Sequence, residues 1–198
     1  MLPEIWANNL HIVFVGCSVP PVCEDLGFYY LTPNNRFWFL LEYAGLTPVS
    51  VVTPAERTSL LNAHKDRVLD DLYRKLFFEK KENILLKHHI GLTDLNRRKV
   101  IAREDDPAGQ PTADDVGKFI RKVEKYSPRI VAAVMKPPLF ERAFSAIFPG
   151  ASQTPGKQDF LIGNSEVWLL GSPAGRVKDP DPMEQLFEDL AARAAQAG

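Results

Sequence analysis

Three short apolar runs constrain the fold of this chain most strongly. They are HIVFVG at 11–16, RIVAAVM at 129–135 and EVWLLG at 166–171. Runs of this length that are rich in β-branched and aromatic residues are typical of strands buried on both faces. Helical patterns lie between them, and strands that alternate with helices predict a parallel sheet. The sequence therefore predicts an α/β fold of three layers, with a central parallel sheet of about four strands flanked by helices.

Helical signals fill the segments between these runs. NNRFWFLLEY at 34–43 spaces its apolar residues as a helix does, and Gly45 supplies a stop signal. TPAE at 53–56 is a capping box with proline at the first helical position, so one or two helices should fill about 54–82. Further helices are expected from Thr112 to about Tyr126, from Pro137, and from Pro182 to about Ala195.

The 54–82 segment carries an apolar stripe of Leu69, Leu72, Tyr73, Leu76 and Phe77. We expect this stripe to face the core, because an amphipathic helix buries its apolar side. The alternative is an exposed docking face, which would make the chain an interaction protein. The charged run EKKEN at 79–83 is expected to end the helix.

Composition limits the class of protein. The chain has 198 residues, of which 45% are apolar and 25% charged, as expected for a single domain over 1–198. No apolar stretch approaches the roughly 20 residues of a transmembrane helix, and no basic region precedes the first apolar run, so neither a membrane nor a signal peptide is expected. Cys17 and Cys23 form no disulfide framework and no zinc or iron–sulfur pattern. We therefore expect a cytoplasmic protein, monomeric, with no metal and no cofactor.

The formal net charge of −1 gives the whole molecule no attraction for nucleic acid. A local basic face would still be enough for binding. The cationic residues that are candidates for such a face are Arg97, Arg98, Lys99, Arg103, Lys157, Arg176 and Lys178.

Chemistry is expected in the loops after Gly16 and Gly171, because ligands of open α/β sheets bind beyond the carboxyl ends of the strands. The first loop reads FVGCSVPPVCEDLGFYYLTPNNRFW, the second lies within EVWLLGSPAGRVK at 166–178, and GLTDL stands between them at 91–95. Together they resemble the mismatch-specific uracil-DNA glycosylase and thymine-DNA glycosylase branch of the uracil-DNA glycosylase superfamily. That branch reads approximately FxGINPG, then Gly-Phe, then HPxNRFW, followed by G-[VF]-T-x-[LM] and a Trp-containing strand before NPSG or SSSA.

The resemblance implies an enzyme that flips uracil, or another deaminated or mismatched base, out of DNA and hydrolyses its N-glycosidic bond to start base excision repair. In the family pattern Tyr30 falls where an aromatic ring stacks on the flipped base, while Gly16 and Cys17 offer backbone groups to its edge. Phe28 and Asn35 are further candidates for base binding. The alternative is that Phe28, Tyr29 and Tyr30 only pack the loop.

The second loop would contact the DNA. Arg176 matches the position of the residue that fills the space left by the flipped base, and its guanidinium could also bond the unpaired opposite base. Ser172 and Lys178 would contact phosphate nearby. Pro173 and Gly175 complete the candidate DNA-binding loop.

Ser18 departs from the family pattern, which carries Asn or Asp at this position to position the attacking water. Serine is a poor general base without a partner. Ser18 could orient water alone, or a carboxylate could have taken over; Asp94 is the first choice, with Glu24 and Asp25 in the first loop as the second. Asp94 could instead be a capping or turn residue beside Arg97 and Arg98, or a group that selects the base. The remaining alternative is a lesion-binding module with weak or absent catalysis.

Overall fold

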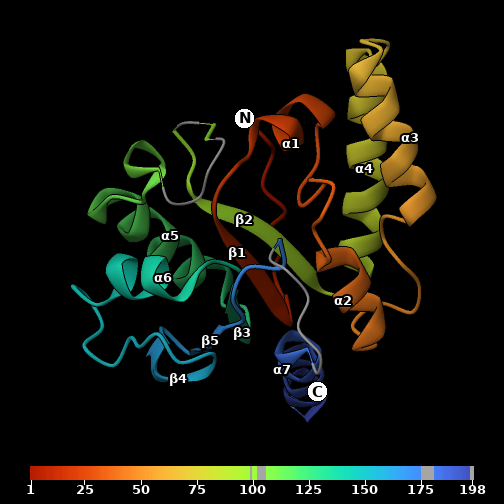
Figure 1. Cartoon of the computed structure of the whole chain (residues 1–198). Helices are drawn as coiled ribbons and strands as arrows, with labels where there is room; N and C mark the ends of the chain where they lie inside the picture. Colours follow the sequence, from red (N-terminus) through yellow and green to blue (C-terminus); the bar gives the residue numbers. More distant parts are fainter. Residues whose placement is uncertain (99, 102–105, 175–180, 197–198) are drawn as a thin grey trace.

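The computed structural model describes residues 1–98, 100–101, 106–174 and 181–196 (Figure 1). Its centre is a five-stranded sheet with the strand order β2-β1-β3-β5-β4. The strands are β1 (Ile12–Ser18), β2 (Ile90–Asn96), β3 (Ile130–Ala133), β4 (Gly156–Ile162) and β5 (Ser165–Leu169). The first three and β5 run parallel, whereas β4 is antiparallel to β5. The predicted α/β class is therefore confirmed, and the three apolar runs form β1, β3 and β5.

Helices cover both faces of the sheet, which gives three layers (Figure 1). They are α1 (Pro21–Leu26), α2 (Phe37–Tyr43), α3 (Pro54–Lys65), α4 (Asp71–Lys87), α5 (Ala113–Tyr126), α6 (Pro137–Phe144) and α7 (Pro182–Gln196), with a short 3₁₀ turn at Pro107–Gly109. Apolar residues of α1, α2, α3, α4 and α7 share one core with Ile12 and Phe14, and those of α5 and α6 share the other with Val13 and Val15. Alternate residues of β1 thus enter opposite cores, as the pleat requires.

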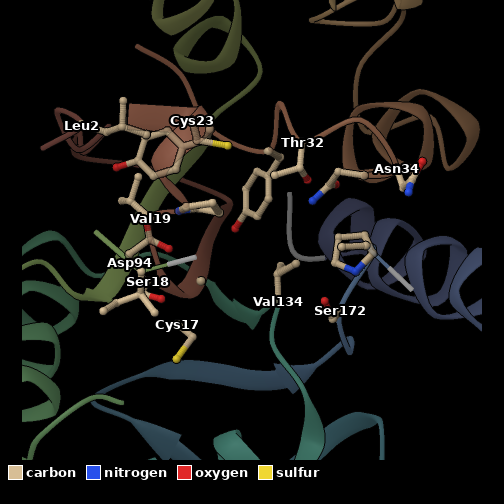
Figure 2. A pocket seen from close by; sticks show the side chains of 18 of the residues that line it. Leu2, Cys17, Ser18, Val19, Cys23, Thr32, Asn34, Asp94, Val134 and Ser172 are labelled. Atoms are coloured by element: carbon tan, nitrogen blue, oxygen red, sulfur yellow. The ribbon is translucent and has the colours of Figure 1, made fainter. Parts of the chain in front are cut away.

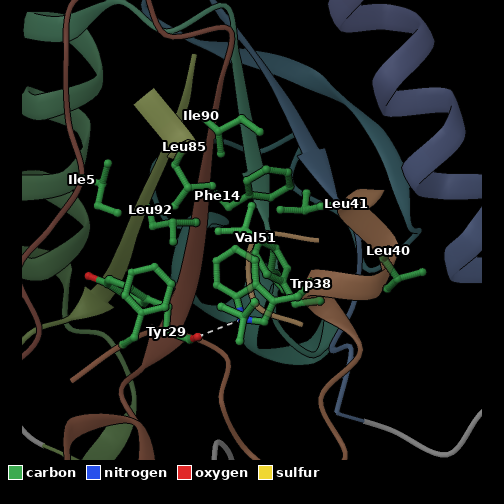
Figure 3. Packing of buried hydrophobic residues seen from close by; sticks show 14 of the residues in the cluster. Ile5, Phe14, Tyr29, Trp38, Leu40, Leu41, Val51, Leu85, Ile90 and Leu92 are labelled. Atoms are coloured by element: carbon green, nitrogen blue, oxygen red, sulfur yellow. Dashed lines mark hydrogen bonds between the residues drawn. The ribbon is translucent and has the colours of Figure 1, made fainter. Parts of the chain in front are cut away.

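Aromatic side chains from the first loop and from α2 dominate the core that contains Ile12 and Phe14. The Trp38 ring stacks on Phe28, with 5.4 Å between centroids, and its Nε1 donates to the Tyr29 carbonyl oxygen at 3.2 Å (Figure 3). Phe14 of β1 meets the edge of Phe37 at 5.1 Å. These contacts fix the long loop against the sheet, so that its remaining residues are held at the carboxyl end of β1.

The antiparallel strand β4 was not expected, and the sheet has five strands instead of about four. β4 and β5 are joined by Gly163 and Asn164, and Gly163 has a φ of 59°. A two-residue Gly-Asn connection is a known hairpin signal. The burial of β4 alternates along its length because it lies at the edge of the sheet. Its sequence therefore lacks the continuous apolar run that identified β1, β3 and β5.

The helical hairpin α3–α4 confirms one expectation and contradicts another. The capping box at Thr53 and Glu56 is present, but α4 does not end in EKKEN and continues to Lys87. Within that run, Lys81 is buried and its Nζ lies 2.7 Å from Glu56 Oε1. The charged run therefore contributes an ion pair between the two helices instead of a helix end.

The predicted core stripe of α4 is largely exposed. Leu72 and Leu76 are 64% and 55% exposed, and Tyr73 is exposed as well. Phe77 alone of the stripe is buried, because α4 packs on the core through Phe77, Phe78, Lys81 and Leu85. The expectation that this stripe faces the core is wrong for Leu72, Tyr73 and Leu76. Leu69, which precedes α4, is half-buried and packs against the core.

The N-terminal segment covers the outer edge of the sheet. Ile5 forms an antiparallel bridge with Leu92 of β2, and the two residues exchange both backbone hydrogen bonds. This contact protects an edge strand that would otherwise present unpaired backbone groups. None of the helices in the described residues has the length and apolarity needed to cross a membrane.

Candidate functional site

A cavity of about 340 Å³ opens at the carboxyl ends of β1, β2, β3 and β5 (Figure 2). Residues from all three predicted motifs line it, although these motifs lie far apart in the sequence. The predicted site residues among its lining are Gly16, Cys17, Ser18, Tyr30, Asn35, Asp94, Ser172 and Pro173. The position agrees with the expectation that chemistry lies beyond the strand ends.

Asp94 enters the cavity directly over Gly16. The two residues are register partners in the parallel pair β1–β2. A Cβ atom placed on Gly16 would overlap Asp94 Oδ1, and it would lie 3.4 Å from the hydroxyl oxygen of Tyr30. Glycine is therefore needed at position 16 for the Asp94 carboxylate to occupy this place. Asp94 is only 6% exposed, so its carboxylate lies in a largely water-excluded wall of the cavity.

The charge of Asp94 acts on two neighbouring groups. Burial, together with the nearby Asp94 carboxylate, raises the pKa of the Cys23 thiol to about 12. The Tyr29 pKa is also raised, first by burial and then by Asp94. Both groups therefore stay protonated and neutral around the carboxylate at physiological pH, and neither supplies a thiolate or phenolate there.

Tyr30 is held as a rigid wall of the cavity. Its ring stacks on Phe37, with 4.0 Å between centroids and 29° between planes. Tyr30 has a φ of 56°, the left-handed region that non-glycine residues adopt rarely. Tyr29 and Tyr30 both line the cavity, but Tyr29 is buried in the core, whereas Tyr30 is half-buried. The arrangement presents an aromatic side chain to a ligand in the cavity.

Asn35 contributes a fixed amide. Its Oδ1 accepts a hydrogen bond of 2.9 Å from the backbone N–H of Phe37, at the start of α2. Its own backbone N–H donates to the Thr32 carbonyl at 3.0 Å. With Oδ1 engaged, the amide Nδ2 is the part of this side chain that can donate to a ligand.

Ser18 is the last residue of β1 and lines the cavity. Figure 2 shows Asp94 and Ser18 on one side of the cavity, with Thr32, Asn34 and Ser172 across from them. The pairing of β1 with β3 ends at Val15 and Ala133, whereas β1 continues to Ser18. This extension brings the backbone of Gly16 and Cys17 to the cavity. The thiol of Cys17 points away from its centre, and Sγ lies 3.9 Å from the Gly109 carbonyl oxygen.

The loop after β5 is tied to the first loop by Arg36. The Arg36 backbone N–H donates to the Pro173 carbonyl at 3.1 Å. Its guanidinium pairs with Asp181 and, at 2.8 Å, with Glu184 at the start of α7. Ser172 and Pro173 are thereby held at the cavity. The other predicted DNA-binding residues of this loop, Gly175, Arg176 and Lys178, lie outside the described residues.

Three predicted residues are placed elsewhere. Phe28 is fully buried between Trp38 and the α4 phenylalanines, so it belongs to the core and does not line the cavity. Glu24 and Asp25 belong to α1 and are likewise not among the cavity's lining residues. The Glu24 carboxylate pairs with the N-terminal amino group, and Asp25 Oδ2 lies 3.9 Å from His64 Nε2. Helix α1 directs both acids toward other partners.

Several lining residues were not anticipated from the sequence. Thr32 and Asn34 lie inside the first motif and could have been proposed from their place between Tyr30 and Asn35. Leu2, Ile101 and Val134 have no such signal, because they reach the cavity only through packing of distant segments. They make part of the wall apolar. No group of three or more His, Cys, Asp or Glu side chains suited to a metal ion occurs among the described residues.

No known protein-family model matches this sequence.

Proposed function

We propose that this protein is a monofunctional DNA glycosylase that removes uracil from DNA by hydrolysis of the N-glycosidic bond. The observation that carries the proposal is the convergence of three separated motifs, resembling those of uracil-DNA glycosylases, on one cavity. The first motif supplies Gly16, Ser18 and Tyr30, the second Asp94 and the third Ser172. A parallel sheet brings its strand ends together in any case, so the support lies in the residue types: each motif contributes a residue that the family pattern places around the base.

The cavity has the parts that a flipped base requires. A base must leave the duplex before its glycosidic bond can be reached. Tyr30 offers a ring for stacking, backed by Phe37, and such stacking is worth about 1–3 kcal/mol per base. Asn35 offers an amide donor, and the backbone of Gly16 and Cys17 offers groups for the base edge.

Asp94 is the proposed catalytic carboxylate. Cleavage breaks the bond between the sugar C1′ and the base nitrogen, whose electrons leave with the base. The sugar becomes oxocarbenium-like and is favoured by a nearby negative charge. Water then adds to C1′, and Asp94 accepts the proton that this water releases. The products are an abasic site and the free base, protonated from solvent.

Ser18 supports this carboxylate in the proposal. It lies on the same side of the cavity as Asp94 (Figure 2). A serine hydroxyl can donate to or accept from a water molecule but cannot hold its proton at neutral pH. Ser18 would therefore orient the water, while Asp94 takes the proton.

The test is base release from oligonucleotides that contain uracil or hypoxanthine, followed by alkali and separation of the cleaved strands. We expect Asp94→Asn to lower the single-turnover rate by about 10²- to 10⁴-fold, the usual contribution of a general base. Ser18→Ala should lower it less. Asp25→Asn is the matched control, since it neutralises an exposed carboxylate of α1 that does not line the cavity. Full activity of Asp94→Asn would refute the catalytic assignment.

Lesion binding without turnover is the second candidate, and Ser18 in place of Asn or Asp is the observation that favours it. Salt-sensitive binding of uracil-containing DNA with no released base would support this candidate. Strand cleavage after alkali with any of the substrates would exclude it.

A further inference from the structure

A second cavity, of about 480 Å³, lies beside α5 and the end of β2. We call it the basic cleft. Its cationic lining residues are Arg97, Arg98, Lys118, Arg121, Lys122 and Lys125. Its carboxylates are Glu4, Asp94 and Asp115. Six cations against three carboxylates, in a protein with a net charge of −1, concentrate positive charge in one place.

Helix α5 supplies four of the six cations on one side. Lys118, Arg121, Lys122 and Lys125 follow the spacing that places residues on one helical face. The opposite face of α5 carries Val116, Phe119 and Val123 into the core, so the cationic face is fixed in direction. Lys118 and Lys125 are separated by roughly 10 Å along the helix axis at 1.5 Å per residue.

Some of these cations have carboxylate partners within the cleft. Glu4 pairs with Lys122 and, at 3.7 Å, with Arg97. Burial raises the Glu4 pKa, but the bonds from Lys122 and Thr93 and the charge of Arg97 outweigh it and hold the pKa below its ordinary value. Glu4 is therefore ionised at neutral pH.

Within the described part of the chain, two further cations of the cleft, Arg98 and Lys118, are paired with carboxylates, and two others are not. Arg98 Nη2 lies 2.7 Å from Asp115 Oδ2, and Lys118 Nζ lies 2.7 Å from Asp114 Oδ2. No carboxylate partner is present for Arg121 or Lys125 among the described residues, and both are exposed. These two side chains give the cleft a positive charge that its own acids do not balance.

The basic cleft adjoins the first cavity. Asp94 lines both, and Arg97 joins the two regions because its Nη2 donates at 2.7 Å to the carbonyl oxygen of Leu2, which lines the first cavity. A polymer with a group in the first cavity would thus have its neighbouring units close to the cleft.

We propose that the basic cleft binds phosphate groups, and that these belong to the backbone of the strand whose base enters the first cavity. The assignment of these phosphates to a DNA strand rests on the proposed function. The length of the cationic face supports a polymer over a single anion. A row of cations roughly 10 Å long can contact more than one phosphate of a strand, whereas a single anion would contact only part of it.

The test is the salt dependence of binding to an undamaged labelled oligonucleotide, measured by fluorescence anisotropy with the full chain. Arg121→Gln with Lys125→Gln should weaken binding and lower the slope of log Kd against log salt by about two, or about one per phosphate contact. The matched control is Arg67→Gln with Lys80→Gln, which removes one arginine and one lysine that are exposed on α4 and its preceding loop. This control should keep the original slope. The Lys125→Gln single variant should give half the change, and thermal melts confirm that each variant folds.

Each outcome separates the cleft from the proposed function. An unchanged slope in the cleft variant would overturn the proposal, while uracil release by the same protein would leave the glycosylase standing. A reduced slope with no uracil released by the unaltered protein would support the cleft and refute the glycosylase. Calorimetric binding of tripolyphosphate that the variant loses, with DNA binding unchanged, would assign the cleft to a free polyphosphate and overturn the nucleic-acid source.

Discussion

The two cavities share Asp94 but differ in charge and in construction. The first is walled by one carboxylate, neutral polar groups and apolar side chains such as Leu2 and Val134. The basic cleft is walled mainly by charged side chains on α5 and after β2. A mainly uncharged wall with an aromatic ring suits a planar base, whereas a wall rich in cations suits a phosphate backbone. Under the proposed function, the first cavity would select the base, and the cleft would contribute affinity that does not depend on base identity.

Gly16→Ala gives the sharpest test of the first cavity. The added methyl group would overlap Asp94 Oδ1, so the carboxylate must move. We expect base release to fall about a hundredfold, as for a displacement of about 1 Å in a catalytic group, with little change in binding to undamaged DNA. Single-turnover rates and anisotropy measure the two effects. A parallel loss of undamaged-DNA binding would break the division between the cavities.

Tyr30→Ala should weaken uracil recognition. Removal of the stacking ring should cost about 1–3 kcal/mol, which is roughly 5- to 150-fold in affinity. The measurement is the ratio of Kd values for uracil-containing and undamaged DNA. Tyr30→Phe is the control, because it keeps the ring on Phe37. Equal losses for both DNAs would show that Tyr30 supports the fold and not the base.

Glu166→Gln tests a region away from both cavities. Hydrogen bonds from Arg193, and then from Lys157, lower the Glu166 pKa from 4.5 to about 2. A carboxylate of lowered pKa stabilises the fold at pH above 4.5 and loses this effect as the pH falls toward 2. The variant should lose about 1–3 kcal/mol of unfolding free energy at neutral pH, and the difference should vanish near pH 2. Urea unfolding measures it, and DNA binding should not change.

Glu4→Gln should have the smallest effect of these variants, and it should raise DNA affinity instead of lowering it. Loss of this carboxylate frees Lys122 and Arg97 in the cleft. Because Lys122 and Arg97 are only partly exposed and already lie in the cleft, DNA affinity should rise modestly, by about two- to fivefold, or about 0.4–1 kcal/mol. Anisotropy at low salt is the measurement, and uracil preference should stay constant. A weaker affinity would contradict a phosphate-binding cleft.

Local sequence signals predicted the elements they directly encode. The box at Thr53 and Glu56 starts α3, and Thr112 starts α5, because a side-chain cap involves only residues within one turn. The apolar runs formed β1, β3 and β5 because strands buried on both faces need apolar residues throughout. The Gly-Asn turn before β5 is a similar local signal, because it predicts a hairpin and therefore a strand before it. Apolar runs alone do not reveal β4.

The candidate site was predicted in part. Gly16, Ser18, Tyr30 and Asp94 were identified from motifs, and they do line one cavity. Phe28 was misplaced because a motif gives the position of a residue in the chain but not the direction of its side chain. Tyr30, two residues after Phe28, lies in a turn with a positive φ, which a run of three aromatic residues does not reveal.

The stripe on α4 shows the limit of periodicity. A helix of 17 residues presents apolar residues on more than one side, and the sheet can receive only one of them. Phe77, Phe78 and Leu85 lie on the side that packs against the core, so Leu72 and Leu76 remain exposed. The choice depends on the angle at which α4 meets the sheet, and that angle is set by distant residues.

The sequence by itself determined the α/β class, the helix starts and the residues that carry the candidate chemistry, because these depend on local spacing and side-chain type. Only the tertiary structure decided that Asp94 lies over Gly16 and that α5 turns its cations toward the end of β2. The pairing of β1 with β2 brings residues 16 and 94 together across 78 positions, and no local pattern encodes a register between strands so far apart.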